Sequence, residues 1–209
     1  TAPVSPKVKL NMALGVILGL LFALGIAYGL DFFDDSVKTA EDAVTALNDP
    51  DGDEDVPMLG AIGRIPEGEL PESIPVACSE SPKSVSAEAY RTLRTGIVFS
   101  FTEQGSRSIL VTGSESGAGK TTNASNLSIV LAQNNFKTVL IDADMRKPML
   151  NKVWDVDGDK GLSSYLIGTN EVEDIVQATS VEDLDIISSG PIPPLPSELL
   201  NGKRFAQLL

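Results

Sequence analysis

Residues Gly113–Thr122 read GSESGAGKTT, and this stretch decides the fold. The apolar run before it, Ser106–Thr112, is predicted to form a buried strand, and Lys120–Asn134 is predicted to form a helix. A glycine-rich turn between a strand and a helix is the context that a phosphate-binding loop requires. The alternative is a glycine-rich turn without a chemical role. We interpret the stretch as the nucleotide-binding loop of an α/β domain.

Each residue type in the loop suits a nucleotide phosphate. Gly117 and Gly119 allow backbone N–H groups to turn toward phosphate oxygens. Lys120 can reach the β- and γ-phosphates of ATP, the Thr121 hydroxyl can ligate Mg²⁺, and the start of the helix adds a partial positive charge. The predicted ATP-binding residues are Ser116, Gly117, Ala118, Gly119, Lys120, Thr121 and Thr122.

Two carboxylates follow the next predicted strand, Lys137–Ala143. Asp142 and Asp144 stand in Ile141–Pro148 (IDADMRKP). Ligands of open α/β sheets bind at the carboxyl ends of the strands, so we expect both side chains to lie beside the loop. Alternating residues of a strand face opposite ways, so one carboxylate can approach Mg²⁺ while the other orients a nucleophile. The alternative is a polar turn with both carboxylates in solvent.

An uncharged segment of 21 residues, Leu10–Leu30, lies near the N-terminus. As a helix it would be about 31 Å long, close to the ~30 Å hydrocarbon core of a bilayer. A buried core helix rarely runs this long without a charge. A signal peptide has a shorter apolar region, followed by small residues rather than by Asp31–Asp35. We therefore predict a transmembrane helix.

Two sequence signals predict opposite orientations for this helix. Lys7 and Lys9 precede the apolar segment and would place the N-terminus in the cytoplasm by the positive-inside rule. The nucleotide site requires cytoplasmic ATP and points the other way. Because two lysines are a weak bias, we expect residues 1–9 outside and the nucleotide domain in the cytoplasm.

The acidic charge is concentrated in one segment. Of a formal net charge of −13, residues 31–80 carry −12, from fourteen acidic and two basic side chains. This distribution describes a solvated linker. It argues against nucleic acid as a partner, because a phosphate backbone is neutralised by clustered Lys and Arg. The chain has no histidine and a single cysteine, Cys78, which excludes imidazole chemistry and an internal disulfide.

Three segments of the linker differ in character. Ser36–Leu47 is a predicted short helix, Asn48–Val56 a predicted disordered stretch, and Pro57–Pro66 an apolar patch that we expect to dock on the globular part. Neither Asn48–Val56 nor Asp155–Gly161 has the glycine and glutamate of a calcium-binding loop, so both are interpreted as polar turns.

The remaining pattern completes the predicted architecture. Ala87–Phe99 and Ser197–Leu209 are predicted helices, and Leu184–Ser188 is a predicted strand. Strands that alternate with helices indicate an α/β fold of the P-loop NTPase type, with a doubly wound parallel sheet that is incomplete in this chain. The predicted regions are a proline-containing tail (1–9), a transmembrane helix (10–30), an acidic cytoplasmic linker (31–80) and the nucleotide domain (81–209).

Glu88, Arg91 and Arg94 are spaced by three and form a charged ridge on the predicted helix. One interpretation is a subunit contact through Arg–carboxylate pairs. The alternative, which physics alone favours, is a solvated face with internal pairing, because most surface pairs contribute less than ~1 kcal/mol.

Taken together, these residues resemble the bacterial tyrosine kinases that regulate capsular and exopolysaccharide synthesis. The resemblance is to the form in which a chain-length-determinant membrane region is fused to the kinase. Ala2–Pro6 is similar to the proline-rich approach to the second transmembrane helix of that family, and Glu88–Arg94 matches its ExxRxxR oligomerisation motif. Ser114–Thr121 resembles its Walker A motif, and Val139–Pro148 resembles its Walker A′ motif.

The resemblance implies a tyrosine autokinase of the inner or plasma membrane, which transfers phosphoryl groups from ATP to tyrosine hydroxyls. Lys120, Asp142 and Asp144 are the catalytic residues that it implies, and Thr121, Asp142 and Asp144 are the implied Mg²⁺ ligands. The two carboxylates would serve metal binding and activation of the substrate hydroxyl.

The resemblance also implies partners. Glu88, Arg91 and Arg94 would hold a homo-oligomeric ring in which phosphorylation occurs in trans between neighbouring subunits. Phosphorylation would then control the chain length, polymerisation and export of a polysaccharide, with the polymerisation and export machinery as partners.

The chain departs from the family pattern in several places. Ser114 stands where GxxxxGK[ST] has its first glycine, and Gly113 comes one place early. Ser116–Lys120 (SGAGK) replaces a frequent Pro-Gly-Glu-Gly-Lys, and Pro194–Pro196 (PLP) replaces Pro-Asn-Pro. The Walker B strand and the tyrosine cluster are missing from the sequence. We therefore expect a fragment that is not a competent kinase by itself.

Two other classes of function stay open. One is a deviant P-loop ATPase of the partitioning or cell-division-positioning type, but Glu115 stands where those proteins carry a signature lysine. The other is a catalytically inactive polysaccharide copolymerase scaffold, against which the intact Lys120, Thr121, Asp142 and Asp144 argue.

Overall fold

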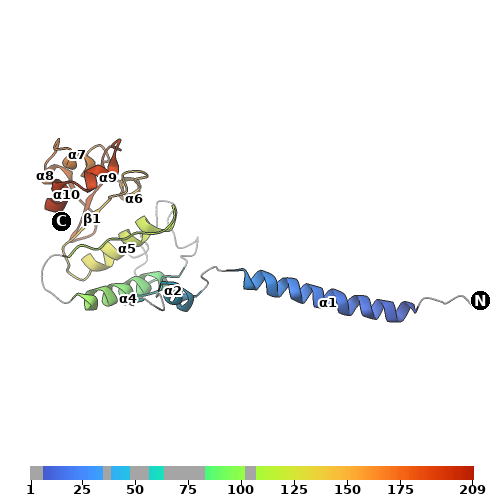
Figure 1. Cartoon of the computed structure of the whole chain (residues 1–209). Helices are drawn as coiled ribbons and strands as arrows, with labels where there is room; N and C mark the ends of the chain where they lie inside the picture. Colours follow the sequence, from blue (N-terminus) through green and yellow to red (C-terminus); the bar gives the residue numbers. More distant parts are fainter. Residues whose placement is uncertain (1–6, 35–38, 48–56, 64–82, 102–106) are drawn as a thin grey trace, which may run out of the picture. The chain divides into compact units, whose positions relative to one another are not determined.

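A computed structural model describes residues 7–34, 39–47, 57–63, 83–101 and 107–209 (Figure 1). The chain divides into two compact units, Thr1–Pro57 and Met58–Leu209. The first unit contains α1 (Val8–Phe32) and α2 (Ala40–Leu47). The 25 residues of α1 include the predicted helix over Leu10–Leu30, and the helix is long and apolar enough to cross a membrane. Its place in a membrane stays a prediction.

Several predictions for the N-terminal half concern residues that the structure does not describe. The tail Ala2–Pro6, the stretch Asn48–Val56 and Cys78 lie outside the described residues. Of the helix predicted over Ser36–Leu47, the structure describes residues 39–47, and Ala40–Leu47 is helical.

The second unit is an α/β domain with one three-stranded sheet in its described part. Its elements in chain order are α4 (Val85–Ser100), α5 (Lys120–Ala132), β1 (Thr138–Ile141), α6 (Leu150–Trp154), α7 (Leu162–Leu166), α8 (Val172–Ile175), β2 (Val176–Ala178), β3 (Leu184–Ile187), α9 (Pro196–Leu200) and α10 (Lys203–Leu208). The sequence predicted α4, α5, β1 and β3 to within a few residues of these bounds.

The strand order is β1-β3-β2, and only part of the sheet is parallel. β1 and β3 are parallel, with Thr138 opposite Leu184 and Ile141 opposite Ile187. β2 is antiparallel to β3, so the prediction of a wholly parallel sheet is wrong at this edge. The reason is local, because only residues 179–183 join β2 to β3, and a parallel pair requires a crossover of a dozen or more residues.

Helices cover both faces of the sheet. Figure 1 shows α5 between α4 and the strands, and the core on this side includes Ile129, Val130 and Ile186, each 0 % exposed. A second apolar cluster on the other side includes Met145, Leu162 and Ile187, with side chains of α9 and α10 packed against it. This layered packing is the P-loop NTPase type of architecture that the motif order predicted.

The strand predicted before the glycine-rich loop is not formed in its described part, residues 107–112. Leu110 is 85 % exposed, and β1, β2 and β3 are the only strands in the described part of the chain. A strand requires a neighbour for its backbone N–H and C=O groups, and none of these three pairs with this segment. An apolar run was therefore insufficient to predict strand structure here.

The helix predicted over Ser197–Leu209 is two helices. α9 ends at Leu200, and α10 starts at Lys203. Gly202 lies in extended backbone between them, with a φ of −79° and a ψ of 157°, and its N–H donates to the carbonyl oxygen of Leu199. The chain therefore turns sharply after α9, which places α9 and α10 separately on the apolar cluster.

Part of the apolar patch predicted over Pro57–Pro66, the described residues 58–63, docks on α4. Ile62 packs against the core, and a Cβ on Gly96 would lie 2.9 Å from the carbonyl oxygen of Leu59. Glycine at this point of α4 thus allows the segment to approach the helix closely. The prediction that the patch covers the globular part is confirmed for these residues.

We predict that Gly161→Ala lowers the free energy of unfolding by about 2–3 kcal/mol, because a Cβ there would lie 2.2 Å from the carbonyl oxygen of Ser188. The measurement is urea unfolding in detergent, followed by the fluorescence of Trp154, the single tryptophan. Gly63→Ala is the control, since its Cβ would meet nothing within 4 Å. Equal effects of the two substitutions would contradict the packing at Gly161.

Candidate functional site

The loop before α5 is a turn that glycine makes possible. Gly117 and Gly119 have φ angles of 85° and 80°, in the left-handed region that side chains with a Cβ rarely adopt. Lys120 is the first residue of α5, and its Nζ donates to the carbonyl oxygen of Glu115 at 3.2 Å. The lysine is therefore folded over the loop. Of the other predicted ATP-binding residues, two are exposed, Ser116 and Ala118, and two are half-buried, Thr121 and Thr122.

Two side-chain hydrogen bonds hold the first half of α5 against its neighbours. The buried Tyr90 of α4 donates its hydroxyl to Oδ1 of Asn123 at 2.8 Å. On another side of the helix, Nε1 of Trp154 in α6 donates to Oγ of Ser125 at 3.1 Å. The sequence analysis did not identify Tyr90 and Trp154, because the spacing of residues does not reveal a hydrogen-bond partner on a distant helix. Together they fix the helix that carries Lys120.

Asp142 is a half-buried carboxylate at the end of β1. Its Oδ2 accepts the backbone N–H groups of Leu150 at 3.1 Å and Met149 at 3.3 Å, and its Oδ1 accepts that of Asp144 at 3.1 Å. Burial raises the pKa of Asp142, the three hydrogen bonds oppose this rise, and the neighbouring Asp144 charge adds to it. The side chain therefore also has a structural role, since it holds the start of α6.

Asp144 is more accessible than Asp142. It is exposed, and its Oδ1 accepts the backbone N–H groups of Arg146 at 3.2 Å and Lys147 at 3.0 Å. Its Oδ2 accepts no hydrogen bond from the residues that the structure describes. This carboxylate keeps one oxygen available for a metal ion or a hydroxyl group.

The direction of α5 brings the loop and the two carboxylates to the same edge of the sheet. Only residues 133–137 join α5 to β1, and the helix packs against the strand, so the two run antiparallel. The 13 residues of α5 span about 20 Å. The start of α5 thus lies at the edge where β1 ends, which is where open α/β sheets bind their ligands.

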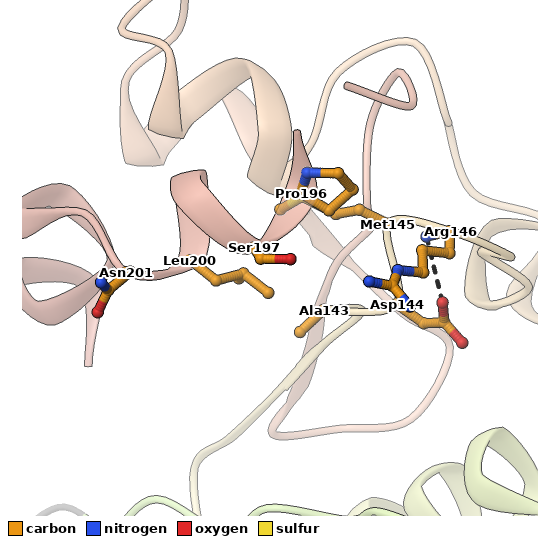
Figure 2. A pocket seen from close by; sticks show the side chains of 8 residues that line it. All are labelled: Ala143, Asp144, Met145, Arg146, Pro196, Ser197, Leu200 and Asn201. Atoms are coloured by element: carbon orange, nitrogen blue, oxygen red, sulfur yellow. Dashed lines mark hydrogen bonds between the residues drawn. The ribbon is translucent and has the colours of Figure 1, made fainter. Parts of the chain in front are cut away.

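A hollow of about 480 Å³ opens beside Asp144 (Figure 2). Its walls are the turn after β1 and one side of α9 with the residue that follows this helix. The sequence reasoning did not include any residue of α9 in the site, because helix Pro196–Leu200 is more than fifty residues downstream of Asp144. The lining residues are Ala143, Asp144, Met145, Arg146, Pro196, Ser197, Leu200 and Asn201.

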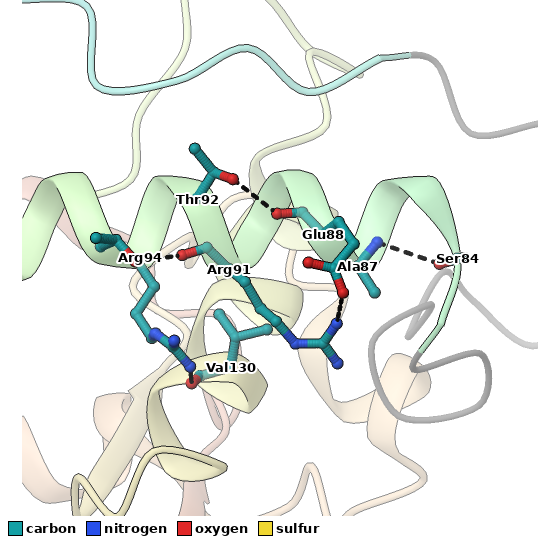
Figure 3. Close-up of polar contacts among 8 residues, drawn as sticks. Ser84, Ala87, Glu88, Arg91, Thr92, Arg94 and Val130 are labelled. Atoms are coloured by element: carbon teal, nitrogen blue, oxygen red, sulfur yellow. Dashed lines mark hydrogen bonds and ion pairs between the residues drawn. The ribbon is translucent and has the colours of Figure 1, made fainter.

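The charged ridge on α4 divides into two parts (Figure 3). Glu88 and Arg91 form an ion pair within the helix, and the Glu88 side chain is 66 % exposed. Arg94 instead donates from Nη1 to the carbonyl oxygen of Val130, at 3.0 Å, in the last turn of α5. A cation suits this place, because carbonyl groups give the C-terminal end of a helix a partial negative charge. The subunit contact through Glu88, Arg91 and Arg94 stays a prediction.

Comparison with known proteins gives consistent matches. The AAA domain family matches residues 106–192. Tyrosine-protein kinase YwqD of Bacillus subtilis (strain 168) is 41% identical over 133 residues, which cover 64% of this chain and 56% of YwqD. Tyrosine-protein kinase etk of Escherichia coli (strain K12) is 32% identical over 224 residues, which cover 99% of this chain and 30% of etk. The solved BceF tyrosine kinase domain is 32% identical with a TM-score of 0.70, covering 82% of this chain and 70% of that chain.

The chain belongs to the bacterial tyrosine kinases. The likeness to the BceF domain extends over the fold, and the match to etk extends over nearly the whole chain, including the region of α1. The chain spans little more than half the length of YwqD and about a third of the length of etk.

In this bacterial tyrosine kinase, Asp142 is expected to make stability depend on pH. Because its pKa is raised from 3.8, its contribution to stability is fully present below that value and is lost as pH rises through the folded-state pKa. Asp142→Asn removes this dependence. Urea unfolding between about pH 4 and pH 7 should show the wild type losing stability relative to the variant as pH rises. A constant difference across the range would contradict this.

A second prediction separates the two arginines of the kinase's α4. Arg94→Met should lower the free energy of unfolding by about 1–2 kcal/mol, because it removes a hydrogen bond between two helices. Arg91→Met is the matched variant and should cost less than about 1 kcal/mol, because its ion pair with the largely exposed Glu88 lies within one helix. The measurement is urea unfolding in detergent followed by Trp154 fluorescence. A larger loss at Arg91 would contradict the assignment.

Proposed function

We propose that this chain is the membrane-anchored, nucleotide-binding part of a tyrosine autokinase that transfers the γ-phosphoryl group of ATP to tyrosine hydroxyls. The proposal is supported by the position of Lys120 at the start of α5 and of Asp144 after the end of β1, in a chain of the bacterial tyrosine kinase family. The names of the relatives YwqD and etk support the same activity.

ATP would bind with its phosphates in the loop before α5. The turn at Gly117 and Gly119 allows backbone N–H groups to face the phosphate oxygens, and the first N–H groups of α5 add a partial positive charge. Lys120 would leave the carbonyl oxygen of Glu115 and reach the β- and γ-phosphates. Ser116, Ala118 and Thr122 would complete the contact.

The residues of the site fit a magnesium ion. Mg²⁺ in nucleotide sites is held by one or two protein oxygens together with phosphate oxygens, so no larger cluster of carboxylates is required. Thr121 and Asp142 would hold it, since three hydrogen bonds leave Asp142 one of its roughly four lone-pair positions. When bound, the ion neutralises charge on the phosphates. Asp144 could serve as a further ligand.

The chain's own groups would then promote the transfer. The tyrosine oxygen forms a bond to the γ-phosphorus, and the bond from the γ-phosphorus to its bridging oxygen breaks, so that ADP leaves with the electron pair. The phenol proton passes to the carboxylate of Asp144, whose Oδ2 is available. Lys120 and the start of α5 stabilise the charge that develops on the phosphoryl oxygens.

The cellular role follows from the family. We propose that residues 10–30 cross the inner or plasma membrane, that residues 31–80 link them to the kinase domain over 81–209, and that this domain is cytoplasmic, where ATP is present. The exposed part of the α4 ridge would join copies in a ring, so that phosphorylation occurs in trans. The state of phosphorylation would regulate the chain length, polymerisation and export of a capsular polysaccharide or exopolysaccharide.

The test uses the full-length gene product that contains this chain, purified in detergent. With Mg·ATP it should become phosphorylated on tyrosine, and Lys120→Met should reduce the rate by about 100-fold or more, because the variant loses the cation at the phosphates. Lys137→Met, at an exposed lysine outside the site, is the control. ATP hydrolysis without phosphotyrosine would instead indicate an ATPase, and neither activity would indicate a scaffold.

A further inference from the structure

One hydrogen bond joins helix α4 to the turn that follows the glycine-rich loop. The hydroxyl of Tyr90 donates to Oδ1 of Asn123 at 2.8 Å, between residues that are 33 positions apart in the chain. Asn123 lies in the first turn of α5, which begins at Lys120. The bond from α4 therefore reaches the turn that carries candidate ATP-binding residues.

The packing of α4 fixes the place of the Tyr90 hydroxyl. The side chain is 1 % exposed and belongs to the apolar core together with Ala87 and Ile97 of the same helix. A phenylalanine would fill nearly the same space without a polar atom. A buried hydroxyl group costs free energy unless it is hydrogen-bonded. The hydroxyl of Tyr90 therefore adds a directed contact to helices that already pack together.

Asn123 contacts the loop through its backbone and through its side chain. Its backbone N–H donates to the carbonyl oxygen of Gly119 at 2.8 Å. A Cβ on Gly119 would lie 3.3 Å from Nδ2 of Asn123, so the amide nitrogen lies close to this glycine. Gly119 is the residue before α5 and has a left-handed φ of 80° with a ψ of 16°. The side chain of Asn123 thus lies beside the backbone turn that the loop requires.

The bond from Tyr90 sets the orientation of the Asn123 amide. An asparagine amide has an acceptor oxygen at one end and two N–H donors at the other. Because Oδ1 accepts from Tyr90, the nitrogen is turned toward Gly119. The opposite orientation would bring the partially negative oxygen to a loop that suits anionic phosphates. The hydroxyl therefore directs the positive end of the amide dipole toward the loop.

We propose that Tyr90 and Asn123 are positioning residues for the nucleotide. The Tyr90 hydroxyl holds the Asn123 amide with its nitrogen toward Gly119, and this arrangement keeps the loop in the conformation that receives the phosphates. A loop that is already held loses less conformational freedom when the nucleotide binds, and the amide dipole favours the phosphate charge. The inference rests on the nucleotide site of the proposed function and adds to it a residue of α4, a different helix.

The test measures the Kd of Mg·ADP by isothermal titration calorimetry, with the full-length gene product in detergent. ADP has no γ-phosphoryl group to transfer, so binding is measured apart from the reaction. Tyr90→Phe removes only the hydroxyl, and Asn123→Leu removes the amide at a similar size. Each should raise the Kd about three- to tenfold, the range expected for the loss of one hydrogen bond.

A double variant separates positioning from stability. Each single substitution leaves one partner of the bond without it and lowers the free energy of unfolding, measured by urea unfolding. Tyr90→Phe combined with Asn123→Leu replaces both partners by apolar groups, so stability should largely return. The Kd should stay raised, and no higher than that of the weaker-binding single variant, because both residues act through one bond. A merely structural contact would regain affinity together with stability.

A second buried tyrosine provides the matched control. Tyr165 is 6 % exposed, lies in α7 and belongs to the second apolar cluster. Tyr165→Phe also removes a phenol hydroxyl from the interior of the domain. It should keep the Kd of Mg·ADP within about twofold of the wild type, because distant sites act independently.

The other outcomes are distinguishable. Wild-type Kd values in both single variants, or in the double variant, would overturn the inference and leave the kinase function standing. A Kd of the double variant equal to the product of the two single effects would also overturn it, because the residues would then act separately. If the wild type binds no Mg·ADP, the proposed nucleotide site fails and this inference fails with it. If it binds Mg·ADP but forms no phosphotyrosine from Mg·ATP, the kinase activity fails, and the comparison of Kd values still decides the inference.

Discussion

The packing of α5 between α4 and the sheet is the contact on which the candidate site depends. From Ser125 to Ala132 every residue of the helix is buried, which is possible only because apolar neighbours cover the helix on opposite sides. Two polar members of this run are satisfied within the helix: Asn126 donates to the carbonyl oxygen of Thr122, and Ser128 donates to that of Ala124. The third, Ser125, accepts from Trp154 of α6. A helix held in this way cannot shift easily, so the backbone of its first turn is fixed in place.

The two aspartates after β1 have different surroundings although they belong to one turn. Asp142 accepts three backbone N–H groups and holds the start of α6, and α6 in turn contributes Trp154 to the contact with α5. Asp144 is exposed, and the hydrogen bonds that it accepts from described residues are made through Oδ1. The raised pKa of Asp142 is the electrostatic consequence of placing a structural carboxylate below the surface. A metal ion at this edge would favour its charged form.

The charged residues of α4 also differ in their surroundings. Arg94 is directed to the C-terminal end of α5 within the same chain, while the Glu88 side chain stays largely in solvent. A motif of three charged residues is thus only partly accessible for a contact between copies. The segment over residues 58–63 also lies on α4, so this helix contacts both that segment and α5.

The sequence by itself determined the elements whose signals are local. The uncharged run predicted α1, the positions of Gly119 and Lys120 predicted the start of α5, and short β-branched runs predicted β1 and β3. The sequence also predicted the loop residues from the Gly-Lys-Thr pattern and the two aspartates from their place after β1, and their roles stay predictions.

Only the tertiary structure decided the rest, because those features depend on partners that are distant in the sequence. The run before the loop was as apolar as β1, but no described strand pairs with it, and it stays out of the sheet. β2 became a strand because a short connection returns the chain beside β3. The packing of helices that are distant in the sequence gives Asp142 and Asp144 their different surroundings. It also sets the direction of Arg94 and forms the hollow beside Asp144. The spacing of residues does not predict which helices pack together.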